Sequence, residues 1–285
     1  MIKPIIYFIQ SIFVYLSLII AKLIGLKLSR KVFSYFFVKF ASRFRSKKLI
    51  ENNLKNLSNK ELNLEKDKII HSMWSNYGMT FIEYIFLNRF KKYNSHISIK
   101  GESNLDNVMK KKKPVIFVSG HFANYELMSM EITKKNIKLA TIYRPLNNYF
   151  INPIMEYLRR KYVCKNQIKK GVNGVRKALE YINGGYSIAL MIDQRVSEGE
   201  KINFFNKPAL TTTLPAQLAI KFNLSIIPVF IERVNHNFFN LEFQDEIKPM
   251  EYDDKIKLSE RLNSVLENMI VRNPYQWIWT HNRWK

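Results

Sequence analysis

The sequence VSGHFANYE, at residues 118 to 126, contains a histidine and a glutamate five positions apart. An imidazole can take a proton from a substrate hydroxyl, and a carboxylate can hold the ring in the orientation that this requires. On one helix, however, five residues turn through about 500°, so His121 and Glu126 would point about 140° apart. A general base and its orienting carboxylate at this spacing therefore require a break between them.

A strand, a loop and a helix in this order would supply the break. The apolar run 115 to 118 predicts a buried strand that ends at Gly120, and Asn124 is a suitable N-cap for the following helix. His121 would then lie in the loop and Glu126 in the first helical turn, where the helix N-terminus favours a carboxylate. We expect the loop to fold the imidazole onto Glu126. A lone histidine near a strand end is usually structural, so other residues must support the interpretation.

Two further polar motifs begin where apolar runs end. YRPLNN, at residues 143 to 148, and DQR, at residues 193 to 195, each follow a predicted strand. In open α/β sheets, ligands bind beyond the carboxyl ends of the strands, so we expect His121, Arg144 and Asp193 to share a site. Each also has a structural interpretation, because Asp193 could cap a loop and Arg144 could pair with a surface carboxylate.

The elements that position these residues are read from alternating patterns that begin at residue 97. Strands are predicted at 114 to 119, 137 to 144, 187 to 193 and 224 to 234. Helices are predicted at 124 to 135, 151 to 163, 171 to 184 and 212 to 222. This alternation predicts an α/β fold with a mixed, partly parallel sheet flanked by helices. An antiparallel strand at 238 to 247 and an amphipathic helix at 253 to 274 complete the pattern.

The N-terminus is strongly apolar. Residues 4 to 21 include no charged side chain, and these 18 residues would form a helix of about 27 Å, close to the roughly 30 Å hydrocarbon core of a bilayer. We predict a transmembrane helix here. The alternatives are a helix lying in the membrane interface and a cleaved signal peptide, which the length of the run disfavours. Positive charge is denser after the run than before it, which predicts that the rest of the chain is cytoplasmic.

The chain accordingly divides into three predicted regions. They are a membrane anchor at residues 1 to 26, a basic amphipathic helical region at residues 27 to 96 and an α/β core at residues 97 to 285. The 46 lysines and arginines against 23 acidic residues give a net charge of +23, which suits an acidic partner or reflects a lysine-rich composition throughout. A single cysteine, Cys164, excludes a disulfide within the chain. The five histidines have no recognisable metal-ligand spacing.

An ordered set of motifs resembles one family. H-x-x-x-x-E after a strand, then YRPLNN, DQ, FFNKPALTT and the ending YQWIWTHNRWK occur in this order in the late acyltransferases of bacterial lipid A biosynthesis. These enzymes belong to the lysophospholipid acyltransferase-like superfamily, whose glycerolipid acyltransferases carry a related motif with aspartate in place of glutamate. The ordered set, with its aromatic C-terminal ending, is more specific than H-x-x-x-x-E alone. The resemblance covers nearly the whole chain.

The resemblance implies transfer of a fatty acyl chain from acyl carrier protein to a hydroxyl of a lipid A precursor, at the cytoplasmic face of the bacterial inner membrane. No metal or other cofactor is implied. His121 would match the general base and Glu126 its orienting residue. The resemblance also implies substrate-binding residues, namely Arg144, Arg159 or its neighbour Arg160, Asp193 and Gln194. Acyl carrier protein and anionic membrane lipids are acidic partners that a basic surface would attract.

Three other interpretations stay open at this point. The acceptor could be a glycerolipid or another glycolipid, or the protein could be a non-catalytic, membrane-attached protein that binds anionic lipid. Nucleic acid is disfavoured because the sequence includes no recognised binding motif and because it would not explain the apolar N-terminus. An acyl-enzyme on Ser119 is disfavoured because this serine belongs to no G-x-S-x-G motif. We therefore expect direct attack of the acceptor on the acyl donor.

Overall fold

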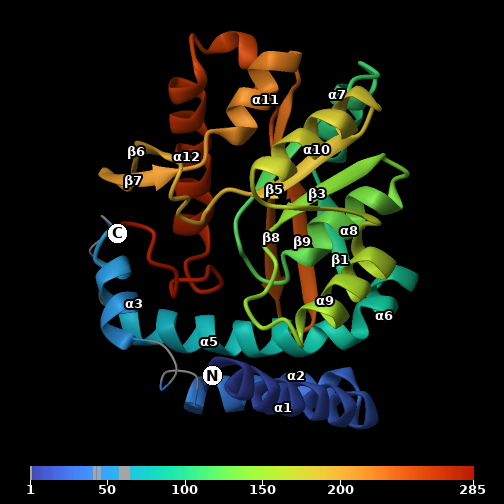
Figure 1. Cartoon of the computed structure of the whole chain (residues 1–285), viewed down its shortest axis with the longest axis vertical. Coiled ribbons are helices and arrows are strands. Elements are labelled where there is room, and N and C mark those ends of the chain that lie inside the picture. Colours follow the sequence, from blue (N-terminus) through green and yellow to red (C-terminus); the bar gives the residue numbers. More distant parts are fainter. Residues whose placement is uncertain (1, 41–42, 44–45, 58–64) are drawn as a thin grey trace.

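A seven-stranded sheet forms the centre of the computed structural model, which describes residues 2–40, 43, 46–57 and 65–285 (Figure 1). The strand order is β1-β9-β8-β2-β5-β3-β4. The strands are β1 (Ile97–Lys100), β2 (Ile116–Ser119), β3 (Leu139–Tyr143), β4 (Asn166–Lys169), β5 (Ser187–Met191), β8 (Ile226–Val234) and β9 (Phe238–Phe243). β8 and β9 pair antiparallel, whereas the other neighbouring strands in this sheet pair parallel. The predicted mixed, partly parallel α/β sheet is confirmed.

The central position of β2 follows from its sequence. Ile116, Phe117 and Val118 are all buried, because β2 has strands on both sides and side chains packed on both faces. A parallel strand in this position is expected to be a continuous apolar run. β2 is therefore a rigid base for the loop that begins at Gly120 and includes His121.

Helices flank the sheet. They are α1 (Ile2–Ile24), α2 (Leu26–Phe40), α3 (Lys47–Leu54), α5 (Lys66–Glu83), α6 (Leu87–Lys92), α7 (Glu102–Met109), α8 (Glu126–Lys134), α9 (Asn152–Leu158), α10 (Val172–Asn183), α11 (Leu214–Phe222) and α12 (Lys255–Arg272). A π-helix, η3 (Arg159–Val163), continues α9, and a short 3-10 helix, η2 (Tyr84–Phe86), continues α5. In Figure 1, α5 crosses the lower part of the view, between the sheet and the pair formed by α1 and α2.

The apolar N-terminal segment forms α1 and α2, which meet at Gly25, where the backbone φ is +78°. Residues 3 to 40 include a stretch long and apolar enough to cross a membrane, by length and composition. One side of α1 packs against the domain, since Leu18 and Ala21 are buried and the Tyr7 carbonyl accepts a hydrogen bond from Asn148. The opposite side is exposed and apolar, as at Phe13. Residues 41–42, 44–45 and 58–64 of the predicted basic helical region lie outside the described residues.

Four strands were not predicted from the sequence. β1 and β4 are the two edge strands of the main sheet. β6 (Glu200–Phe204) and β7 (Lys207–Thr211) form a separate antiparallel hairpin within the segment that holds FFNKPALTT. The two residues between them, Phe205 and Asn206, both have positive φ, as a tight two-residue hairpin loop requires. The hairpin packs against α12 through Asn263, which donates a hydrogen bond to the Asn203 carbonyl.

Candidate active site

The carboxyl ends of three adjacent parallel strands carry the predicted polar residues. His121 follows β2, Asp193 follows β5 and Arg144 follows β3. β5 lies between β2 and β3 in the sheet, so the three strand ends meet at one edge. A cavity of about 540 Å³ opens there, and His121, Glu126, Arg144, Arg159 and Gln194 are among the residues that line it. The fold therefore brings together most of the site residues expected from the sequence.

Asp193 is the residue that orients His121. The aspartate is 3% exposed and receives two hydrogen bonds from His121, one from the backbone N–H at 2.8 Å and one from the ring Nδ1 at 2.7 Å. Trp277 donates a third through Nε1 at 2.9 Å. Burial raises the pKa of Asp193, but the charge of His121 and these hydrogen bonds outweigh it and hold the pKa below its usual value. An ionised Asp193 favours the tautomer whose Nδ1 carries the proton, so Nε2 is left with its lone pair.

Glu126 has a different partner from the one predicted. Its Oε1 accepts hydrogen bonds from Arg159, at 2.8 Å from Nε and 2.6 Å from Nη2, and another from the Tyr84 hydroxyl. The expected contact of Glu126 with His121 is thus replaced by an ion pair with Arg159, because the buried guanidinium offers two donors to the carboxylate. In the described part of the chain, the carboxylate that holds the His121 ring is Asp193.

The predicted N-cap at Asn124 is also wrong. Helix α8 begins at Glu126, and its preceding residue Tyr125 makes no side-chain cap. The Asn124 side chain instead donates a hydrogen bond to Glu83 at 2.8 Å. The ionised Glu83 carboxylate is a strong acceptor for the Asn124 Nδ2–H, so the side chain points into the interior and not to the helix terminus. Glu126 nevertheless lies at the start of α8, as expected, where the helix dipole favours its negative charge.

The structure separates the two neighbouring arginines. Arg159 is the first residue of the π-helix and points into the cavity, where its guanidinium lies 5.7 Å from the Tyr84 ring centroid and 5.6 Å from that of Tyr143. Burial lowers the pKa of Arg159, but the charge of Glu126 and the neighbouring tyrosines raise it by more. The net effect is a pKa above the usual value, so the side chain stays cationic. Arg160 is exposed and pairs with Glu156 at 2.8 Å on another surface. Of the two, Arg159 is the residue that a substrate in the cavity could contact.

We expect Arg159→Ala to lower the activity of the site much more than Arg160→Ala. Arg159→Ala leaves the buried Glu126 carboxylate without its cation, whereas Arg160→Ala removes one exposed ion pair that contributes little. The expected loss in kcat/KM is at least about tenfold for Arg159→Ala and less than about twofold for Arg160→Ala. Steady-state kinetics of both purified variants check this. Equal losses for the two variants would contradict the assignment of Arg159.

Several residues in the cavity or directly behind its wall were missed as site residues in the sequence. The Tyr125 ring packs on His121 with centroids 4.6 Å apart, and Tyr84 donates to Glu126. His281, in the C-terminal motif, lines the same cavity, and burial lowers its pKa, which keeps it neutral near pH 7. The motif thus indicated His281 and Trp277 as characteristic residues, whereas no local pattern pointed to Tyr84.

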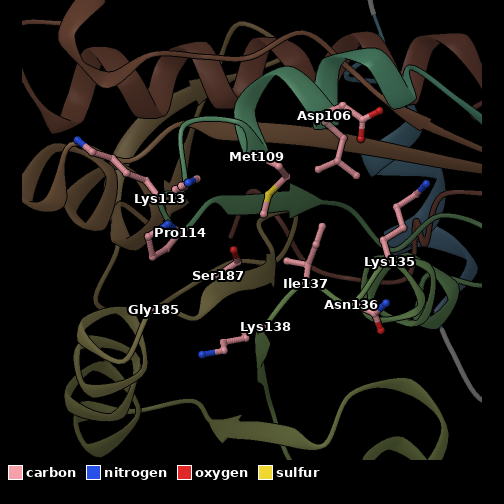
Figure 2. A pocket seen from close by; sticks show the side chains of 12 residues that line it. Asp106, Met109, Lys113, Pro114, Lys135, Asn136, Ile137, Lys138, Gly185 and Ser187 are labelled. Atoms are coloured by element: carbon pink, nitrogen blue, oxygen red, sulfur yellow. The ribbon is translucent and has the colours of Figure 1, made fainter.

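A second cavity, of about 460 Å³, lies at the opposite ends of the strands, beside α7 (Figure 2). Four lysines and one carboxylate are among its lining residues, which include Asp106, Lys112, Lys113, Lys135, Lys138 and Ser187. Ser187 begins β5, so this cavity opens at the amino ends of the strands. Its lining, as described, has no histidine, and its one carboxylate, Asp106, is exposed. The cavity at His121 is therefore the candidate active site.

Metal-ligating side chains do not gather in the described part of the chain. Among residues 2–40, 43, 46–57 and 65–285, no three histidine, cysteine, aspartate or glutamate side chains are grouped so that they could hold a metal ion. Cys164, the one cysteine of the sequence, is buried. His121, whose imidazole can accept a proton, lines the cavity together with the cationic groups Arg144 and Arg159.

A family model and the curated relatives agree on one family. The family model described as "Bacterial lipid A biosynthesis acyltransferase" matches residues 2–285. Lipid A biosynthesis palmitoleoyltransferase of Escherichia coli (strain K12) is 22% identical over 231 residues, which are 78% of this chain and 72% of that protein. A lipid A biosynthesis acyltransferase of Shigella flexneri is also 22% identical, over the same shares of the two chains. The solved structure of the 1-acyl-sn-glycerophosphate acyltransferase PlsC from Thermotoga maritima matches 89% of this chain and 100% of its own, with a TM-score of 0.43 and 15% identity.

Proposed function

Because the chain belongs to the bacterial lipid A biosynthesis acyltransferase family, we propose that it moves a fatty acyl chain from acyl carrier protein to a hydroxyl of a lipid A precursor. His121 is the general base, and Asp193 is the residue that orients it. The observation that carries the proposal is the His121–Asp193 pair, in which buried Asp193 holds a histidine that lines the same cavity as Arg144 and Arg159. A base with a free Nε2 beside two cations matches the needs of acyl transfer to an alcohol.

The proposed reaction has two steps and no covalent acyl-enzyme. The acceptor hydroxyl attacks the thioester carbonyl while its proton passes to Nε2 of His121, which forms a C–O bond and a tetrahedral oxyanion. The C–S bond then breaks, and the leaving thiolate takes the proton from the imidazolium. Asp193 stabilises the imidazolium in between, because its carboxylate accepts the Nδ1–H throughout. Atoms and charge balance without an additional reactant.

Arg144 is our candidate for binding anionic groups of the substrate. Its described side-chain hydrogen bond is a long one, 3.4 Å to Asn147, so its guanidinium keeps donors for a ligand. Arg159 is instead engaged by Glu126, which fixes its position at the cavity wall. We assign the oxyanion or a substrate phosphate to Arg144, with Gln194 as a neutral hydrogen-bonding group in the same cavity. Apolar side chains such as Met128, Leu190 and Ile278 supply a surface for an acyl chain.

The net positive charge and the apolar N-terminal helices are consistent with a reaction at a membrane surface that uses acidic acyl carrier protein. A net charge of +23 favours encounter with acidic acyl carrier protein and with anionic lipid. The apolar segment of α1 and α2 supports attachment to the inner membrane with the sheet domain on the cytoplasmic side, where the acceptor lipid would be reached. Release of the full chain from membranes by an alkaline carbonate wash would contradict this attachment.

Product analysis tests the substrate assignment. Purified protein is incubated with acyl carrier protein carrying C12, C14 or C16 chains and with either a lipid A precursor or a lysoglycerophospholipid, each in mixed micelles. We expect a mass gain of one acyl group on the lipid A precursor. Acylation of the lysoglycerophospholipid alone would favour the glycerolipid alternative. Binding to anionic vesicles without turnover of any acceptor would favour the non-catalytic alternative.

A further inference from the structure

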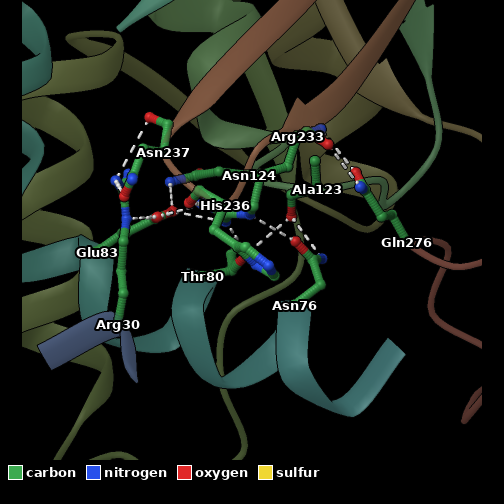
Figure 3. Close-up of polar contacts among 10 residues, drawn as sticks. All are labelled: Arg30, Asn76, Thr80, Glu83, Ala123, Asn124, Arg233, His236, Asn237 and Gln276. Carbon is green, nitrogen blue, oxygen red and sulfur yellow. Dashed lines mark hydrogen bonds and ion pairs between the residues drawn. The ribbon is translucent and has the colours of Figure 1, made fainter. Parts of the chain in front are cut away.

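A buried polar network lies behind the loop that includes His121, with Glu83 of α5 at its centre (Figure 3). The Glu83 side chain is fully buried. Its Oε1 accepts from Arg30 Nε at 2.6 Å and from Arg233 Nη1, and its Oε2 accepts from Arg233 Nη2 at 3.0 Å and from Asn124 Nδ2 at 2.8 Å. One carboxylate therefore joins α2, α5, β8 and the loop that precedes α8.

A second set of contacts holds the neighbouring residue of the loop. The Ala123 carbonyl accepts from Thr80 Oγ1 at 2.9 Å and from Asn76 Nδ2 at 3.4 Å, while its N–H donates to the Gln276 carbonyl at 3.3 Å. Arg233 reaches Thr80 and Asn76 as well, at 3.2 Å and 2.9 Å. The same guanidinium thus supports the groups that hold Ala123.

The backbone of this loop needs such support. Ala123 has a φ of +43°, a left-handed conformation that alanine rarely adopts and that persists when surrounding contacts hold it. Ala123 and Asn124 lie between His121, which bonds to Asp193, and Glu126, which bonds to Arg159. A change of conformation at either residue would move the imidazole relative to Asp193.

Ion pairs of Glu83 with Arg30 and Arg233 stabilise the network. Burial raises the pKa of Glu83, but the charges of Arg233 and Arg30 outweigh it and hold the pKa below its usual value. Glu83 therefore contributes stability to the fold at neutral pH, and this contribution is lost as the pH falls through its folded pKa. Replacing Glu83 would leave two buried arginines without an anion and would destabilise the fold. A test must therefore change the uncharged side chains that connect the network to the loop, Asn124 and Thr80.

We propose that Glu83 and Arg233 are positioning residues for His121, acting through Asn124 and Thr80 on the loop between β2 and α8. The inference rests on the proposed function, because it assigns these residues to the geometry of the proposed base. Arg30 extends the same network to α2, so the segment assigned to membrane attachment and the catalytic loop share one buried carboxylate.

The test compares variants that cut the links to the loop with a control that cuts a link elsewhere. Asn124→Ala removes the donor to Glu83, and Thr80→Val removes the hydroxyl that donates to Ala123 while keeping the side-chain shape. Thr80→Ser restores the hydroxyl. The control, Asn237→Ala, removes an acceptor of Arg30 on an exposed side of the network (Figure 3).

We expect kcat to fall at least about tenfold in Asn124→Ala and Thr80→Val, with KM for either substrate changed less than about twofold. Thr80→Ser and Asn237→Ala should keep kcat within about twofold of the wild type. Thermal unfolding of all four variants is measured in parallel. If Asn124→Ala does not fold, the comparison of Thr80→Val with Thr80→Ser alone tests the inference.

Two results would overturn the inference. One is a wild-type kcat in folded Thr80→Val, and the other is an equal loss in Thr80→Val and Thr80→Ser, which would assign the effect to packing alone. His121→Ala, assayed alongside, distinguishes a failure of the positioning role from a failure of the proposed function. If His121→Ala is inactive while Thr80→Val is fully active, the positioning role fails and the proposed function stands. If His121→Ala is fully active, the proposed function itself fails.

Discussion

His121→Ala is expected to lower the turnover of acyl transfer by about 10² to 10⁴, the range that a positioned general base usually contributes. The acceptor hydroxyl then lacks the imidazole that is held by Asp193 to take its proton as it attacks the thioester. KM should change little, because the cationic and apolar walls of the cavity stay in place. Initial rates of product formation at saturating substrate check this expectation.

His71→Ala is the matched control for that variant. His71 is exposed on α5, outside the residues that line the cavity, so its removal should leave kcat within about twofold of the wild type. The fold of His121→Ala should also be kept, because Asp193 retains its hydrogen bond from Trp277. A folded His121→Ala variant with wild-type turnover would exclude His121 as the base.

Asp193→Asn is expected to reduce kcat by a similar factor, up to about 10⁴, as in other systems where the carboxylate behind a catalytic histidine becomes an amide. The amide can present an N–H to Nδ1, which would favour the wrong tautomer and place the ring proton on Nε2. Nε2 would then be unable to accept the proton of the acceptor. Exposed Asp254, which caps α12, supplies the control Asp254→Asn.

The pH dependence of Asp193→Asn gives an independent measurement. Folding lowers the pKa of Asp193, because the charge of His121 and the hydrogen bonds to the carboxylate outweigh the effect of burial. The wild type should therefore lose stability as the pH falls through the folded pKa of Asp193, and the variant should not lose this part. An equal pH dependence of unfolding in the wild type and the variant would contradict the pairing.

The sequence predicted the interior of the sheet much better than its edges. β2, β5 and β8 are apolar because neighbours cover them on both sides, and their runs were visible in the sequence. The two edge strands were missed because each has only four residues and few of them are buried: β1 buries none, and β4 buries only Ile168. The hairpin of β6 and β7 was missed because its turn is Phe205-Asn206 and not one of the glycine-containing pairs that usually mark such turns.

For the site, the sequence predicted which residues gather but not how they pair. Ligands bind beyond the carboxyl ends of the strands in open α/β sheets, and this rule predicted that His121, Arg144 and Asp193 lie at one edge of the sheet. The partner of His121 depends on the contact between β2 and β5, which are far apart in the sequence, so nearby Glu126 was the natural expectation. Arg159, which forms the ion pair with Glu126, lies in a π-helix that no local sequence pattern predicted.

Mass spectrometry of lipid and protein together during a single turnover tests the central claim most directly. Enzyme in excess is mixed with acyl-loaded acyl carrier protein and a lipid A precursor, and samples are quenched from milliseconds to minutes. The account predicts that the lipid gains one acyl group while the mass of the protein never changes, and that His121→Ala abolishes the gain on this timescale. An acylated form of the protein that precedes the product, or a lipid that gains no acyl group with the wild-type protein, would contradict it.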